Sequence, residues 1–205
     1  MKEKYQIAVA KAVSLICEPY YLPLVVYLAL MSFSYLKLLP MDYKLMLLGW
    51  IVLFTVVIPL AVMQILKGVI TARNRAEWLR KYRWAAYVVF MINYEACLMV
   101  MKRSVMPQIL QNVIFAALVI QLACFALNFF IKASAHSAAA GGLVGALVAF
   151  AFIFGFDPRG WLCVLLVFAG LVGTSRLLLR RHTLREVNVG LAVGFVGGLA
   201  AILLG

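Results

Sequence analysis

The sequence predicts an all-α protein, a polytopic transmembrane helical bundle of about six to seven spans. Hydrophobic residues make up 66% of its 205 residues and charged residues only 13%, whereas soluble domains are roughly 45–50% apolar and about 25% charged. The apolar residues also gather in runs close to the roughly 20 residues that a helix needs to cross a bilayer. The composition therefore excludes a soluble globular domain. It also excludes a disordered chain, which needs low hydrophobicity and high charge.

Seven apolar runs, separated by charged residues and by Pro or Gly, define the expected spans. They are Val13–Leu36, Lys44–Leu66, Trp84–Met101, Gln108–Ile131, Ala138–Phe156, Trp161–Leu178 and Val187–Leu204. In the last run Gly190, Gly194 and Gly198 recur every four residues, which predicts a small-residue face for close helix packing. The connections leave no room for a soluble domain, so we expect residues 1–205 to form a single integral membrane domain.

The chain carries 19 Lys and Arg against 7 Asp and Glu, a net charge of +12. The basic residues flank the apolar runs, which favours membrane lipids over nucleic acid as partners. If all seven runs cross, the N-terminus and the segments 67–83, 132–137 and 175–186 share one side, which we call face A. All basic residues lie on face A except Lys37, Lys44, Lys102, Arg103 and Arg159. The positive-inside rule then predicts a cytoplasmic face A, and we expect a bacterial inner membrane as the location.

The two histidines are the scarcest polar residues, and both are expected on face A. His136 precedes the fifth run and His182 precedes the seventh, with Glu186 four residues later. That spacing places His182 and Glu186 on one face of a helical turn, where the carboxylate can contact the imidazole and select its tautomer. Alternatively, the histidines are ordinary interfacial residues, and Glu186 begins the last helix at the favourable end of its dipole.

The residues around the histidines resemble a known family. Ser175-Arg176, five residues, His182, three residues and Glu186 resemble the third signature of the type 2 phosphatidic acid phosphatases, in which Asp stands in place of Glu. Ala133-Ser134-Ala135-His136 resembles the second signature, Pro-Ser-Gly-His. The resemblance covers a core of about residues 130–204.

A candidate for the first signature of that family, Lys, six residues and Arg-Pro, lies near residues 67–75. Lys67 can begin it, but strict spacing reaches Asn74, so Arg73 or Arg75 has to substitute. No Pro follows Asn74. This motif therefore departs furthest from the family pattern.

The resemblance implies a hydrolase that needs neither a metal ion nor another cofactor and acts on a phosphate monoester or pyrophosphate of a lipid. It implies that His182 attacks phosphorus to form a phosphohistidine, that Glu186 orients the ring, and that His136 protonates the leaving oxygen. The expected phosphate-binding residues are Arg176, Lys67, Ser134, Arg73 and Arg75. Backbone amides near Ser137 and Ala138, at the start of the fifth run, are expected to add to this site.

Two other functions stay open at this stage. The change from Asp to Glu and the missing Pro and Gly of the second signature also suit an inactive protein that binds or transports lipid phosphates on the same scaffold. A metal site built from His136, His182 and Glu186 is weaker, because three ligands alone would need help. Glu95, an acid within the third run, fits either a polar path or a structural pair.

Overall fold

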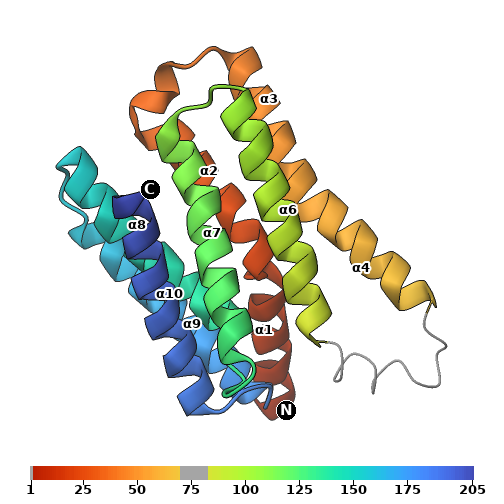
Figure 1. The fold of residues 1–205 in the computed structure, drawn as a ribbon. Helices are drawn as coiled ribbons and strands as arrows, with labels where there is room; N and C mark the ends of the chain where they lie inside the picture. Colours follow the sequence, from red (N-terminus) through yellow and green to blue (C-terminus); the bar gives the residue numbers. More distant parts are fainter. Residues whose placement is uncertain (1, 70–82) are drawn as a thin grey trace.

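The computed structural model describes residues 2–69 and 83–205, and in these residues it is all-helical. The helices form a bundle in which successive spans run in alternating directions, with α1 continued by α2 and α3 continued by α4 (Figure 1). They are α1 (Lys2–Ile16), α2 (Leu22–Phe33), α3 (Met41–Val52), α4 (Ile58–Val69), α6 (Arg83–Arg103), α7 (Gln108–Leu127), α8 (Ala135–Phe154), α9 (Arg159–Leu178) and α10 (Leu184–Leu204). Within the described residues, six helices are long and apolar enough to cross a membrane, or up to seven if the bent pair α1 and α2 counts as one span. The predicted fold class is confirmed.

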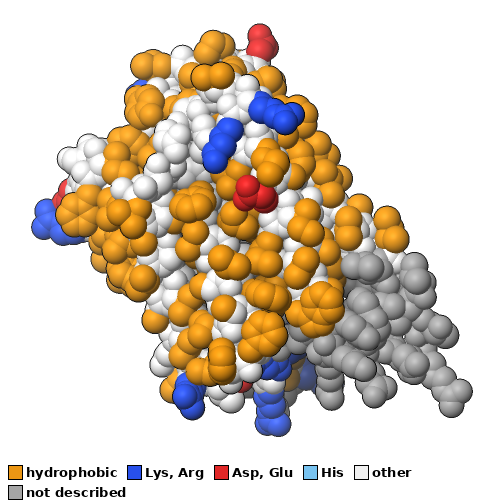
Figure 2. Space-filling view, in the orientation of Figure 1, with side chains coloured by type: hydrophobic (Ala, Val, Ile, Leu, Met, Phe, Trp, Pro, Cys, Tyr) orange, Lys and Arg blue, Asp and Glu red, His pale blue; other side chains and the backbone are white. Residues whose placement is uncertain are grey.

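The outer surface of the bundle is apolar along the helices. Leu166, Val167 and Leu171 of α9 are more than half exposed, as is Phe152 of α8. Figure 2 shows hydrophobic side chains over the middle of one face, with most Lys and Arg towards the ends of the helices. Exposed aliphatic side chains in such numbers are stable only against lipid. The chain is therefore an integral membrane protein.

The first expected span, Val13–Leu36, is bent rather than straight. The segments Lys4–Ile16 and Pro19–Ser32 are bent by 40° against each other. Pro19 is the cause, because proline disfavours a helical conformation of the residue before it and has no N–H for a helix bond. Glu18 accordingly has φ −63° and ψ 135°, and Pro19 begins the short 3-10 turn η1 (Pro19–Tyr21). The bend places Glu18 between two helices rather than within one.

The second span also departs from a regular helix. A π-helical turn, η3 (Leu53–Val57), joins α3 to α4, and the N–H of Ile58 donates to the Leu53 carbonyl five residues back. The buried Pro59 follows directly, and its missing N–H leaves the carbonyl of Thr55 without its usual helical donor. Beyond this turn α4 leans away from the rest of the bundle (Figure 1).

The five later spans lie where the sequence predicts them, with shifted ends. Two helices begin three residues earlier than their apolar runs, because Ser134 and Thr183 cap polar first turns that hydropathy alone does not register. α7 ends at Leu127 rather than Ile131. The small-residue face of α10 is confirmed: a Cβ on Gly194 would overlap the Ala138 carbonyl of α8, and one on Gly198 would overlap the Gly142 carbonyl.

Candidate functional site

The close packing of α8 against α10 brings the two histidine motifs together. Glycines of both helices take part, since a Cβ on Gly141 of α8 would overlap the Leu191 carbonyl of α10. At the end of this contact the N–H of Ser134 donates to the Glu186 carbonyl over 3.2 Å. The segment before α8 and the first turn of α10 are thus joined directly, although about 50 residues separate them in the sequence.

Glu186 has two roles at the start of α10. Its Oε2 lies 2.9 Å from His182 Nδ1, which confirms the contact predicted from the i, i+4 spacing. The same oxygen accepts the N–H of Thr183 over 3.2 Å, while the Thr183 hydroxyl accepts the N–H of Glu186. This reciprocal pair is a capping box. Both interpretations of Glu186 that the sequence allowed are therefore correct at once.

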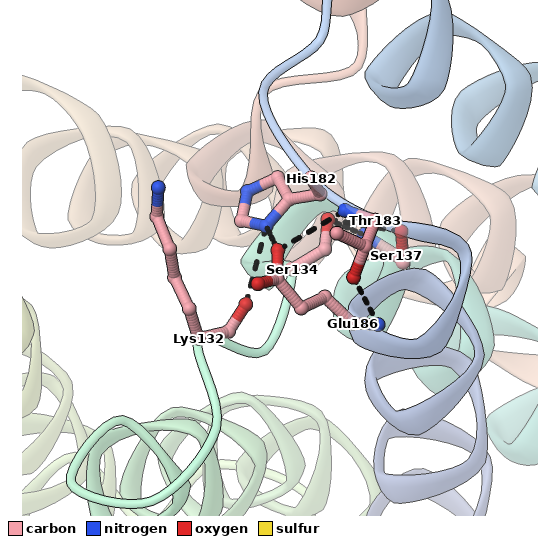
Figure 3. A network of polar contacts seen from close by, with 6 residues as sticks. All are labelled: Lys132, Ser134, Ser137, His182, Thr183 and Glu186. Carbon is pink, nitrogen blue, oxygen red and sulfur yellow. Dashed lines mark hydrogen bonds and ion pairs between the residues drawn. The ribbon is translucent and has the colours of Figure 1, made fainter.

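The surroundings of His182 select one tautomer of its ring. Nδ1 faces two acceptors, the Glu186 carboxylate and the Lys132 carbonyl at 3.2 Å, so Nδ1 carries a hydrogen and Nε2 has the free lone pair. In Figure 3 the second ring nitrogen points away from Glu186. A lone pair directed away from the orienting carboxylate is the arrangement of a nucleophile or a general base.

The pKa of His182 lies below its ordinary value of 6.5. Burial of the ring is the largest cause, because it disfavours the charged form, and the nearby positive charge of Arg176 acts in the same direction. The hydrogen bond and negative charge of Glu186 raise the pKa without cancelling these two influences. His182 is therefore neutral at pH 7 and keeps its lone pair.

His136, in the first turn of α8, faces Glu18, which was not among the predicted site residues. Its Nε2 lies 3.4 Å from Glu18 Oε2, at ion-pair distance. The two groups are not aligned as a hydrogen bond, so this buried Nε2 has no hydrogen-bond partner among the described residues. An acid next to a proline within the apolar run Val13–Leu36 was the signal that could have found Glu18.

Arg176 enters the same region from the last turn of α9. One of its terminal nitrogens donates to the Ser14 hydroxyl of α1, and the negative charge of Glu18 attracts the guanidinium. Its Nε is buried and has no hydrogen-bond partner within the described part of the chain. An unsatisfied buried donor is costly, so this nitrogen is suited to a ligand that brings an acceptor oxygen.

Four of the side chains described above line one cavity of about 350 Å³. Its polar lining includes Glu18, His136, Arg176 and His182, contributed by four different parts of the chain. The remaining lining comes mainly from aromatic and apolar side chains: Pro19, Tyr20, Met63, Ala86, Tyr87, Phe90, Tyr94, Gln121 and Ala135. A polar end enclosed by an apolar wall suits an amphiphilic ligand with an anionic group.

A smaller apolar cavity of about 60 Å³ adjoins the first. Pro19, Tyr94, Gln121 and Ala135 line both cavities. The rest of the smaller cavity is formed by aliphatic side chains such as Leu22, Val26 and Leu143. The polar groups therefore lie next to apolar space inside the bundle.

Other expected phosphate ligands are not placed in this cavity. Ser134 is fully buried and caps α8, where its Oγ accepts both the N–H and the hydroxyl of Ser137. The N–H of Ala138 donates to the Ser134 carbonyl. The amides of Ser137 and Ala138 are thus already engaged, and the expected backbone contribution from them is wrong.

The first-signature candidates cannot be compared with the cavity. Lys67 belongs to α4, but its side chain lies outside the described residues, as do Arg73 and Arg75 entirely. Glu95 is exposed on α6. It does not line the cavity that holds the histidines.

Among the described residues, no group of three or more His, Cys, Asp or Glu side chains could hold a metal ion. Compared with known proteins, the chain matches no family model, no curated protein and no solved structure.

Proposed function

We propose that this membrane protein is a lipid phosphatase that hydrolyses a phosphate monoester or pyrophosphate of a lipid through a phosphohistidine. The observation that carries the proposal is the single cavity that holds His136, His182 and Arg176. These three residues belong to the two motifs that resemble the second and third signatures of the type 2 phosphatidic acid phosphatases. The residues are distant in the sequence, so their convergence is independent of the motif spacing.

The first step is attack on phosphorus. The lone pair of His182 Nε2 forms the new P–N bond while the bond from phosphorus to the leaving oxygen breaks, and His136 gives its proton to that oxygen. The Glu186 carboxylate holds Nδ1 and stabilises the positive charge that the ring gains. Arg176, with its unsatisfied Nε, binds a phosphoryl oxygen and offsets its charge.

The second step returns the protein to its starting state. Water attacks the phosphorus of the phosphohistidine, His136 accepts a proton from that water, and the P–N bond breaks to release inorganic phosphate. The two steps require one nucleophile, one acid–base group and a cation. As proposed, they need no metal ion or other cofactor.

A lipid is the proposed substrate class because the polar groups lie beside apolar space. The phosphate binds among the polar groups of the 350 Å³ cavity, while its apolar chain lies between helices. We also propose a bacterial inner membrane as the location and a cytoplasmic orientation of face A, which the excess of Lys and Arg supports.

The function is tested by phosphate release from a panel of lipid phosphates and lipid pyrophosphates. The wild-type protein in detergent is expected to release phosphate, and His182→Ala is expected to lose at least about 100-fold in rate because no other group replaces the nucleophile. Trapping of a phosphorylated protein in the wild type but not in His182→Ala would identify the intermediate.

Two controls accompany this experiment. Glu95→Gln, on the exposed surface of α6, is expected to keep the wild-type rate, and EDTA is expected to leave turnover unchanged. Equal release by the wild type and His182→Ala would overturn the catalytic role of His182. Binding of lipid phosphates without any release would favour the inactive binding or transport protein instead.

A further inference from the structure

Glu18 is the charged residue of the cavity that the proposed reaction does not yet use. Its carboxylate lies 3.4 Å from His136 Nε2, with 29% of the Glu18 side chain and 12% of the His136 side chain exposed. No other acidic side chain lines the cavity among the described residues. Its position beside His136, rather than beside His182, links it to the leaving-group side of the proposed reaction.

The backbone holds Glu18 at this place. Pro19 keeps Glu18 in an extended conformation between α1 and η1. The ring of Tyr20, two residues later, stacks on Phe90 of α6 with centroids 5.9 Å apart and an interplanar angle of 8°. The bend and this ring contact turn Glu18 towards the interior.

The charges around Glu18 make its carboxylate stable there. Arg176 approaches from α9 and attracts it, while His136 approaches from α8. A half-buried carboxylate without cationic neighbours would be costly, so the attraction of Arg176 offsets part of the cost of burying Glu18. The Glu18 carboxylate faces Nε2 of His136.

We propose that Glu18 is a positioning residue for His136: it holds the Nε2 side of the ring, so that the other ring nitrogen, Nδ1, gives its proton to the leaving oxygen of the substrate. The proposal rests on the phosphatase function proposed above. Glu18 forms no bond to the substrate and transfers no proton. The proton moves from His136 to the leaving oxygen as the bond from phosphorus to that oxygen breaks, and the later attacking water restores it to His136.

The leaving group provides a test that separates this role from a merely structural one. An alkyl lipid phosphate expels a strongly basic alkoxide that needs the proton of His136, whereas a nitrophenyl phosphate expels a weakly basic phenoxide that does not. Both substrates are to be measured with Glu18→Gln, which keeps the size of the side chain and removes its charge.

For Glu18→Gln we expect kcat on the alkyl lipid phosphate to fall by about tenfold or more. KM is not expected to rise, since loss of the carboxylate leaves Arg176 more available to the substrate. The fall on nitrophenyl phosphate is expected to be several times smaller. His136→Gln is expected to show the same dependence on the leaving group, and the double variant to be no slower than His136→Gln alone, because both changes act through one proton transfer.

Glu95→Gln is the matched control, because it removes the same charge from an exposed position, and it is expected to change neither substrate's rate. Equal losses on both substrates in Glu18→Gln, or additive losses in the double variant, would overturn the positioning role while leaving the phosphatase function intact. A folded wild type that hydrolyses neither substrate would overturn both proposals.

Discussion

His182 shows how neighbouring groups prepare one side chain for chemistry. Two acceptors at Nδ1 decide which nitrogen carries the hydrogen. Burial and Arg176 then keep the ring neutral, while Glu186 opposes them. A nucleophile needs both conditions, because a charged imidazole has no free lone pair and the wrong tautomer would direct its lone pair away from the substrate.

At the residue scale, Glu186→Gln tests this balance. Gln keeps the capping box of α10 but removes the negative charge that raises the pKa of His182, so that pKa is expected to fall further. Activity requires neutral His182 and is lost as pH falls through its pKa. The acidic limb of kcat/KM should therefore move to lower pH than in the wild type.

In the same variant kcat should fall by about tenfold or more, because the developing charge on His182 loses its partner. The pH profile of phosphate release measures both effects. An acidic limb that moved to higher pH, or an unchanged kcat, would contradict the role assigned to Glu186. Thr183→Val is the control, since it weakens the helix cap without touching the imidazole ring.

At the element scale, two helix contacts assemble the site. The glycines of α8 and α10 allow their backbones to meet, which joins the segments bearing His136 and His182. The proline-induced break between α1 and α2 supplies Glu18, and the Ser14 contact ties α1 to Arg176 of α9. The geometry of the proposed catalytic site depends on small residues and one proline rather than on a long loop.

Gly194→Ala tests the helix contact. Its added methyl group would overlap the Ala138 carbonyl, so the helices must separate. We expect a loss of about 1–3 kcal/mol in stability and a clear fall in phosphate release. Thermal unfolding in detergent and the release assay measure the two effects.

Gly170→Ala of α9 is the matched control for this experiment. A Cβ at Gly170 meets no atom within 4 Å, so stability and turnover are expected to stay at wild-type values. If Gly194→Ala melted and turned over like Gly170→Ala, the close contact would not be what holds the two motifs together.

At the scale of the whole molecule, the site lies at one end of the bundle. α7 separates the turn at Ser104 from the connection at Lys132, and Figure 1 places the start of α10 and the N-terminus near the latter end. The proposed phosphate-binding groups therefore face one side of the membrane. If the proposed function is correct, that side decides which pool of lipid phosphates can reach them.

Cysteine labelling tests the proposed orientation. In a variant without the four native cysteines, Lys132→Cys and Ser104→Cys place single thiols at exposed positions on opposite ends of α7. If face A is cytoplasmic, a membrane-impermeant maleimide should label Ser104→Cys but not Lys132→Cys in spheroplasts, and both after lysis. Labelling of Lys132→Cys alone before lysis would reverse the orientation.

Most features that depend on neighbouring residues could be predicted from the sequence. The composition determined the membrane environment, the apolar runs determined most spans, and the i, i+4 spacing determined the contact of His182 with Glu186. These features follow from the length of a bilayer-crossing helix and from its 3.6-residue turn, which act locally along the chain.

The tertiary structure decided which distant groups meet. Only in the folded protein does Glu18 lie beside His136 and does Arg176 bind Ser14 of α1. Ser134 caps α8 and does not line the cavity. Val13–Leu36 is one apolar run in the sequence, but Pro19 bends the helix within it. Such contacts depend on how bent helices pack against one another, and the residues that join there are separated by up to 162 positions, so no local spacing in the sequence determines them.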